Sequence, residues 1–142
     1  MILLDTDHLT LLKYADSERG VRLNERLRAL PPEEVVAVSI ISVEEQMRGW
    51  LAAIAREREA RRQVFGYAEL ARLLDYFRAF TVAPFDERAA DQFDHLRAAK
   101  IRLGTMDLKI AAVALVNRAL LLSANRRDFE QVPGLRVENW LE

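Results

Sequence analysis

The sequence predicts an α/β fold, in which helices pack against a mostly parallel central sheet. Two observations lead to this prediction. Short apolar segments with the composition of strands alternate with longer amphipathic segments along the chain. One apolar segment, residues 35–41 (VVAVSII), is rich in β-branched residues, which is typical of a strand buried on both faces of a parallel sheet. With 142 residues and no linker or internal repeat, the chain is expected to form a single domain spanning residues 1–142.

The first half of the chain contains two predicted strands and the helices that follow them. Residues 2–4 (ILL) form a short apolar strand, after which apolar positions recur at helical spacing as far as Lys13. Residues 21–30 show the same helical spacing and end before two prolines, which cannot continue a helix. The strand at 35–41 comes next, and a long charged helix is expected over residues 42–62.

The second half of the chain repeats the alternation. Residues 64–79 predict a helix whose start is weakened by Gly66, and this helix is expected to form an antiparallel hairpin with the preceding one. The remaining expected elements are a short strand within 80–85, a helix over 86–100 begun by Asp86, a helix from Thr105 to Arg118, a strand ending near Ser123, and a last short strand within 135–139.

Composition excludes several classes of protein. The chain has no cysteine, so disulfides, thiolate metal sites and cysteine nucleophiles are excluded. Its two histidines, His8 and His95, leave little for a zinc site, and His8 is expected on a helix surface or at a helix cap. The net charge of -1 gives no overall attraction to nucleic acid, so such a ligand would need a local basic patch or a metal bridge. Without a membrane-spanning apolar segment or a signal-peptide pattern, a cytoplasmic location is expected.

Four acidic residues lie where a predicted strand gives way to a helix or just inside a helix start. They are Asp5, Glu45, Asp107 and Asp128. Because the carboxyl ends of parallel strands meet at one edge of a sheet, these side chains are expected to converge. Carboxylate oxygens suit Mg²⁺ or Mn²⁺, and an ion that keeps open positions can bind a phosphate and activate a water. The pattern therefore predicts metal-dependent phosphodiester chemistry.

The first two acids also have local structural explanations. Asp5 or Asp7 can cap the helix after the first strand, although burial directly after ILL favours a ligand role for Asp5. Asp7 is then a candidate for supporting the ligands from the first helical turn. Ser42 and Glu45 have the spacing of a capping box, and the neighbouring Glu44 leaves the choice of acid open by one position.

Asp107 is expected in the first turn of a helix capped by Thr105, where the helix dipole favours an acid without any further purpose. The residues after it are almost wholly apolar, so this helix must be buried and Asp107 stands at the edge of the core. Asp91 and Asp94, on the preceding helix, are expected to be solvated. Asp107 is therefore the preferred candidate of the three.

Asp128 is expected in a polar loop after a buried strand. Ser123, Asn125 and Asp128 can each turn the chain by bonding to its backbone, but a single turn needs only one such residue. Ser123 and Asn125 are therefore candidates for supporting the metal ligands or orienting water. Arg126 and Arg127 are candidates for contacts with RNA phosphates, and a solvated loop explains them equally well.

Four short segments of the chain together resemble one known family. They are LLDTDHL (3–9), SVEEQMRG (42–49), GTMDLKIAA (104–112) and SANRRDFEQVPGL (123–135). In this order and spacing, they resemble the PIN-domain ribonucleases, and specifically the VapC toxins of toxin–antitoxin pairs. Each motif alone is weak, but the four together make a specific match over nearly the whole chain.

The resemblance implies a PIN-like three-layer α/β/α sandwich with a catalytic acidic cluster and Mg²⁺ or Mn²⁺ as cofactor. It also implies a homodimer that is inhibited by a VapB-type antitoxin. The residues it assigns to catalysis and to the metal are Asp5, Glu45, Asp107 and Asp128. Glu45 is preferred to Glu44 because the family motif has its glycine, here Gly49, four positions after the acid. The chain departs from the family at Asp7, where Asn is common, at Ser123, where Thr is common, and at Lys109, where an apolar residue is usual.

The expected function is a metal-dependent endoribonuclease toxin of a VapBC-type pair, which cleaves tRNA or another structured RNA at a single-stranded loop. One alternative is a PIN-domain nuclease of RNA processing outside any toxin–antitoxin system. A second alternative, from a different class, is a non-catalytic Mg²⁺-binding signalling or binding module. A receiver-type signalling module is disfavoured because Ser42, and not an acceptor Asp, follows the middle strand.

Overall fold

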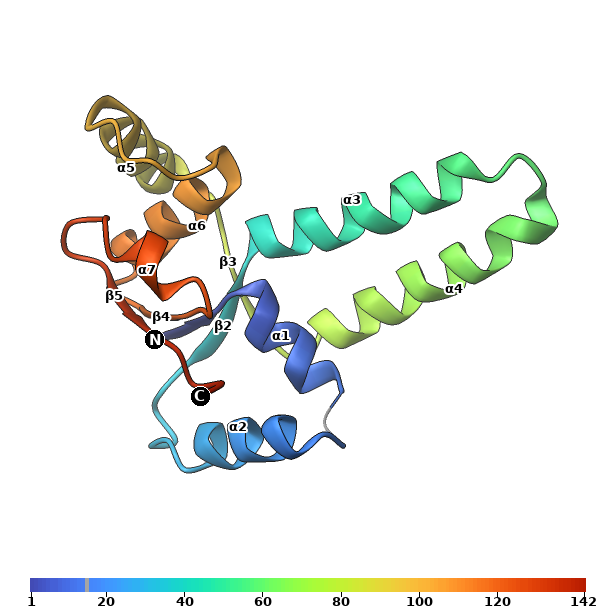
Figure 1. The fold of residues 1–142 in the computed structure, drawn as a ribbon, viewed down its shortest axis with the longest axis horizontal. Helices are drawn as coiled ribbons and strands as arrows, with labels where there is room; N and C mark the ends of the chain where they lie inside the picture. Colours follow the sequence, from blue (N-terminus) through green and yellow to red (C-terminus); the bar gives the residue numbers. More distant parts are fainter. Residues whose placement is uncertain (15) are drawn as a thin grey trace.

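The computed structural model describes residues 1–14 and 16–142, in which strands and helices alternate as predicted (Figure 1). The strands are β1 (Ile2–Leu4), β2 (Val36–Ser39), β3 (Thr81–Ala83), β4 (Leu120–Leu122) and β5 (Arg136–Glu138). The helices are α1 (Thr6–Lys13), α2 (Glu18–Arg28), α3 (Ile40–Arg56), α4 (Ala60–Phe77), α5 (Glu87–Ala98), α6 (Thr105–Val116) and α7 (Arg126–Phe129). Every helix in this part of the chain is too short or too polar to span a membrane.

The five strands form one sheet in the order β3-β2-β1-β4-β5, and every neighbouring pair is parallel. The sequence predicted a mostly parallel sheet, and this prediction is confirmed. β1 lies at the centre, where Leu4 pairs with Val38 on one side and with Leu122 on the other. β2 and β3 follow β1 in sequence and lie on one side of it, and β4 and β5 lie on the opposite side.

Side chains of alternate strand residues enter two separate hydrophobic cores. Leu3 packs with α5 and α6 on one face of the sheet, while Ile2 and Leu4 pack with α1 and α4 on the other. The central strand β1 is therefore buried on both faces, as its continuous apolar composition predicts, while the edge strands β3 and β5 are partly exposed. The α/β/α sandwich is the result.

The second strand is shorter than predicted, since it ends at Ser39 and not at residue 41. The Ser39 hydroxyl accepts a hydrogen bond from the Ile41 backbone N–H at 3.0 Å and caps α3, so Ile40 and Ile41 belong to the helix. The expected capping box of Ser42 and Glu45 is wrong, because both residues lie inside α3. Ile40 and Ile41 are apolar residues in the first turn of a helix, and directly after a strand such residues have the same sequence pattern as a longer strand.

The predicted helical hairpin is confirmed, and it projects from the sheet as a long arm (Figure 1). Its helices break at residues 57–59, earlier than the predicted break near residue 63. Gly66 does not weaken the start of α4, which begins six residues before it. A Cβ atom at Gly66 would lie 2.6 Å from Cγ1 of Ile54, so this glycine lets α3 and α4 approach closely.

Three smaller differences follow from local capping. α2 begins before the predicted residue 21 because the Ser17 hydroxyl accepts a hydrogen bond from Gly20 N–H at 3.0 Å. Gly104, and not Thr105, is the N-cap residue of α6. A short helix, α7, replaces the expected loop around Asp128.

Candidate functional site

The candidate site lies beyond the carboxyl ends of β1 and β4. The strand order changes direction here, because β2 and β3 lie on one side of β1 and β4 and β5 lie on the other. In open parallel sheets, ligands bind at this kind of switch point. Asp5 directly follows β1 and Ser123 directly follows β4. The backbone N–H of Asp5 donates to the Leu122 carbonyl at 2.9 Å, and the Ser123 hydroxyl donates to Asp5 Oδ2 at 2.8 Å. β4 and the residue directly after it therefore hold Asp5 in place.

Asp5 is a carboxylate in a largely dry position, with only 8% of its surface exposed. Its Oδ1 caps α1 by accepting from the Thr6 N–H at 2.8 Å. Burial raises the pKa of Asp5 above its ordinary value, and the hydrogen bonds from Ser123 and Thr6 offset this only in part. The nearby negative charges of Asp7 and Asp107 raise the pKa of Asp5 further. Asp5 therefore both caps α1 and belongs to a cluster of neighbouring carboxylates.

Glu45 and Asp107 face the same region from α3 and α6. Burial raises the pKa of Glu45, and the charges of Asp5 and Asp107 add to the rise. Burial also raises the pKa of Asp107, and the negative charges of Asp128 and Asp7 raise it further. These mutual effects mean that the acids lie within electrostatic range of one another.

The structure distinguishes Glu45 from its neighbour Glu44. Glu44 forms an ion pair with Arg48 one turn further along α3. Glu45 interacts electrostatically with Asp5 and Asp107 across the site. Of the two glutamates left open by the spacing of the sequence, Glu45 is therefore the one that faces the acidic cluster.

The donor set fits a hard divalent cation. In residues 1–14 and 16–142, no three acidic or histidine side chains lie close enough to enclose a metal ion as they stand. The cluster nevertheless supplies only oxygen donors, which Mg²⁺ and Mn²⁺ prefer, and Mg²⁺ usually retains several waters between itself and the protein. Two buried hydroxyls, Thr6 Oγ1 and Ser42 Oγ, have no hydrogen-bond partner among the described atoms. Thr6 follows Asp5, and Ser42 precedes Glu45 by one helical turn.

Asp7 has a supporting position, not a central one. Its Oδ2 accepts from the Ala124 backbone N–H at 2.8 Å, and its Oδ1 lies 2.6 Å from Nδ1 of His8. Burial alone would raise the pKa of Asp7, but the hydrogen bonds from His8 and Ala124 outweigh it and hold the pKa below its ordinary value. Asp7 therefore anchors the loop after β4.

His8 is the residue that sequence reasoning misjudged. It was expected on a helix surface or at a cap, but its side chain is fully buried. Its ring contacts Asp7 on one side and the backbone of Trp140 on the other. Because Trp140 lies 132 positions away in sequence, no local pattern indicates this contact.

The loop after β4 and helix α7 carry the remaining candidates. Ser123 is buried, and its hydroxyl also accepts from the Asn125 N–H at 3.0 Å. Asn125 precedes α7 but makes no capping bond through its side chain. Asp128 is exposed in α7 and raises the pKa of Asp107. Arg126 and Arg127 are exposed at the same end of the molecule, and Arg126 forms an ion pair with Glu130.

The fold and the site together define a class of protein: an α/β/α domain with an entirely parallel sheet and an acidic cluster at its switch point. The PIN domain family profile matches residues 2–135. The chain therefore belongs to the PIN domain family and, within it, to the VapC toxins of VapBC toxin–antitoxin systems.

Two relatives support this assignment from sequence. The tRNA(fMet)-specific endonuclease VapC of Salmonella typhimurium is 30% identical over 109 residues, covering 74% of this chain and 75% of that protein. The ribonuclease VapC2 of Haemophilus influenzae is 32% identical over 71 residues, covering 47% of this chain. The latter match spans 54% of that protein's length, so the chain aligns with about half of it.

A structural comparison supports the fold independently. A chain from the crystal structure of DNA-bound VapBC from Salmonella typhimurium superposes with a TM-score of 0.71 and covers 99% of both chains. The sequence identity is 24%, so this similarity is evidence for the fold alone. The predicted PIN-like three-layer architecture is confirmed.

Proposed function

We propose that the chain is a metal-dependent endoribonuclease, the toxin of a VapBC-type pair. The observation that supports this proposal best is the cluster of acids at the switch point. Burial and mutual repulsion raise the pKa values of Asp5, Glu45 and Asp107. A site that concentrates negative charge in this way gains stability from a divalent cation. Family membership supports the same chemistry, since the relatives are a ribonuclease and a tRNA endonuclease.

In this proposal, Asp5, Glu45, Asp107 and Asp128 hold Mg²⁺ or Mn²⁺. When bound, the ion supplies electrostatic stabilisation of the phosphate and a water of lowered pKa. The chain's own residues prepare the site. Ser123 and the Thr6 N–H fix the orientation of Asp5, and Asp7 holds the loop that carries Ser123. Asn125, which lies in the same loop, is proposed to orient a water beside the acids.

The proposed substrate is a single-stranded loop of tRNA or of another structured RNA. Bases in such loops are unstacked and accessible, unlike those in the deep major groove of an RNA helix. Arg126 and Arg127 are proposed to contact the phosphates on either side of the cleavage site. Arg127 forms no ion pair in the described part of the chain, so it is available for this contact without breaking one. The proposal places the protein in the cytoplasm, where these substrates occur.

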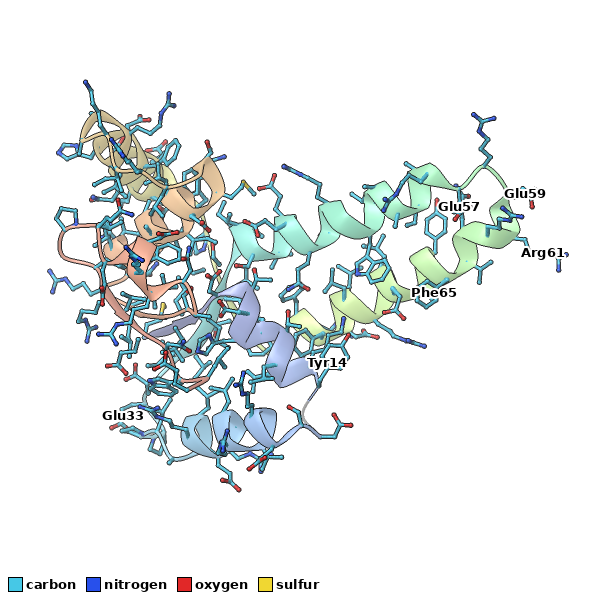
Figure 2. The ribbon with its side chains drawn as sticks, in the orientation of Figure 1. Tyr14, Glu33, Glu57, Glu59, Arg61 and Phe65 are labelled. Atoms are coloured by element: carbon cyan, nitrogen blue, oxygen red, sulfur yellow. The ribbon has the colours of Figure 1, made fainter. Side chains whose placement is uncertain are left out.

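The proposed partners are a VapB-type antitoxin and a second copy of the chain. The arm formed by α3 and α4 carries exposed apolar side chains, a common property of protein-binding surfaces. They include Leu51, Val64, Phe65 and Tyr67, and Figure 2 shows Phe65 on α4, part of the way along the arm. The related solved structures come from toxin–antitoxin complexes, which supports a partner of the same kind here.

The direct test is cleavage of total tRNA and of a generic single-stranded RNA in Mg²⁺ or Mn²⁺. The purified wild-type protein is compared with Asp107→Asn, and each reaction is repeated in EDTA. Asp94→Asn serves as the matched control, because it removes the same charge from an exposed position on α5. We expect cleavage by the wild type and by Asp94→Asn only, and none in EDTA. Cleavage by Asp107→Asn at the wild-type rate would show that the site is assigned wrongly.

A further inference from the structure

A continuous set of hydrogen bonds connects the C-terminal segment to the candidate metal site through His8. The backbone N–H of Trp140 donates to Nε2 of His8 at 3.1 Å. Nδ1 of the same ring lies 2.6 Å from Oδ1 of Asp7. The ring is fully buried, so water does not compete for either contact.

These two contacts fix the protonation of the ring. A backbone N–H can only donate, so Nε2 must be the unprotonated nitrogen that accepts it. The proton of a neutral imidazole then resides on Nδ1 and is donated to Asp7. His8 is therefore the neutral Nδ1–H form, oriented by the main chain of residue 140.

The other carboxylate oxygen of Asp7 connects His8 to the loop after β4, which carries Ser123. Asp7 Oδ2 accepts from Ala124 N–H at 2.8 Å, and Ala124 directly follows Ser123. The Ser123 hydroxyl, in turn, donates to Asp5 at 2.8 Å. Rotation of the Asp7 carboxylate would therefore release the loop that holds Asp5.

The side chain of Trp140 is held by contacts with β5 and α2. The Trp140 indole N–H donates to Glu138 Oε2 at 2.7 Å, and the guanidinium carbon of Arg26 lies 4.0 Å from the centroid of the indole ring. This anchoring places the Trp140 backbone in position to bond with His8. Residues far from the acids in sequence thus form part of their support.

We infer that His8 is a positioning residue for the metal site, coupling the docked C-terminal segment to Asp5 through Asp7 and the loop after β4. This inference rests on the metal-binding function proposed above. Groups that orient metal ligands from behind typically change metal affinity by about 10- to 100-fold when removed. A histidine that merely fills space in the core would have no such effect on metal affinity.

Two substitutions separate the two bonds of the ring. In His8→Asn, the side-chain amide stands near the place of Nδ1, so donation to Asp7 is kept and the bond from Trp140 is lost. In His8→Gln, the longer amide reaches the place of Nε2, so the bond from Trp140 is kept and donation to Asp7 is lost. The readouts are hydrogen exchange of the Ala124 and Trp140 amides and the Mn²⁺ affinity of the folded protein by calorimetry.

For His8→Gln we expect faster exchange at Ala124 and a Mn²⁺ affinity about tenfold lower than wild type. For His8→Asn we expect faster exchange at Trp140 and a smaller loss of affinity. Wild-type Mn²⁺ affinity in His8→Gln with Ala124 still protected would overturn the inference. Nitrogen NMR of the wild-type ring gives a second test that needs no variant, since an Nε2–H tautomer would also overturn it. If the wild type binds no Mn²⁺, the proposed function fails, while the exchange and tautomer measurements still decide whether the hydrogen-bonded connection exists.

Discussion

Asp5 and Asp7 lie two positions apart, yet their pKa values move in opposite directions. Burial dominates at Asp5 and raises its pKa. At Asp7, burial also acts upward, but the hydrogen bonds from His8 and Ala124 outweigh it and the pKa falls. A raised pKa means that ionising Asp5 costs stability as the pH rises, whereas the lowered pKa of Asp7 means that its ionised form stabilises the fold. A bound cation would therefore offset the cost of ionising Asp5.

The pKa of Asp107 is raised, as that of Asp5 is, so the same reasoning predicts how its contribution to stability depends on pH. Its stabilising contribution is present below the unfolded-state pKa and is lost as the pH rises through the folded-state pKa. In EDTA at pH 7.5, Asp107→Asn should therefore match or exceed the wild type in stability. The gain should be at most about 1 kcal/mol, because solvent screens a half-buried charge.

The measurement is urea unfolding of both proteins in EDTA at pH 7.5 and at pH 4, with Asp94→Asn as the control for net charge. The gain of Asp107→Asn should shrink at pH 4, because the raised pKa means that the wild-type carboxyl binds a proton more readily in the folded than in the unfolded state. A variant that is less stable at pH 7.5 would contradict the assignment of Asp107 to a repulsive cluster.

At this scale, the sequence located the acids but not the groups that hold them. Asp5 could be predicted because it directly follows an apolar strand, and Asp107 because it precedes a buried helix. Ser39 could not be preferred to Ser42 as the cap of α3, since Ser39 lies inside the apolar run 35–41 and only Ser42 follows it. The contacts of His8 could not be predicted either, because they depend on a residue at the other end of the chain.

Among the elements, the arm of α3 and α4 depends on one close approach. Gly66→Ala would place a Cβ atom 2.6 Å from Cγ1 of Ile54. Overpacking of this kind costs about 1–3 kcal/mol, which exceeds the gain of about 1 kcal/mol from replacing a helical glycine. Gly49 on α3 is the matched control, since its Cβ would meet no atom within 4 Å.

We expect Gly66→Ala to lower the free energy of unfolding by about 1 kcal/mol and Gly49→Ala to raise it by a similar amount. Thermal and urea unfolding of the two variants provide the comparison. Equal stabilisation by both substitutions would mean that the helices do not approach each other at Gly66 as described.

A hydrogen bond connects the base of the arm to α1. The Tyr76 hydroxyl donates to the Leu9 carbonyl at 2.8 Å, and burial raises the pKa of Tyr76 to about 12. Tyr76→Phe should cost about 1 kcal/mol at neutral pH, because the buried carbonyl loses its donor. Since the folded-state pKa is raised, the contribution of Tyr76 is fully present below pH 10 and is lost as the pH rises toward 12. Unfolding curves of the two proteins should therefore converge between these pH values, and a constant difference would contradict this role.

The order of the strands, and of the helices other than α7, could be predicted from hydrophobic periodicity, but several boundaries could not. The end of β2 and the break between α3 and α4 depend on which polar group caps a helix and on how helices pack. The short helix α7 escaped prediction because four residues are too few to show a helical period.

For the whole molecule, the exposed apolar side chains of the arm predict self-association. Phe65 is 67% exposed, and Figure 2 shows it on the arm, away from the sheet. Phe65→Ser should weaken the proposed dimer by removing apolar surface from the interface. Tyr14→Ser is the control, because Tyr14 is 60% exposed at the end of α1. Sedimentation equilibrium should detect weaker association in Phe65→Ser alone, and equal masses for both variants would place the dimer interface elsewhere.

The central claim for the molecule is that its converging acids form a divalent-metal site. Glu44 and Glu45 test it most directly, because they are adjacent in α3 but have different partners: Glu45 interacts with Asp5 and Asp107, and Glu44 pairs with Arg48. The measurement is Mn²⁺ affinity by calorimetry for the wild type, Glu44→Gln and Glu45→Gln. The account predicts that Glu44→Gln binds Mn²⁺ as the wild type does and that Glu45→Gln binds at least about tenfold more weakly. Wild-type affinity in Glu45→Gln, or an equal loss in both variants, would contradict it.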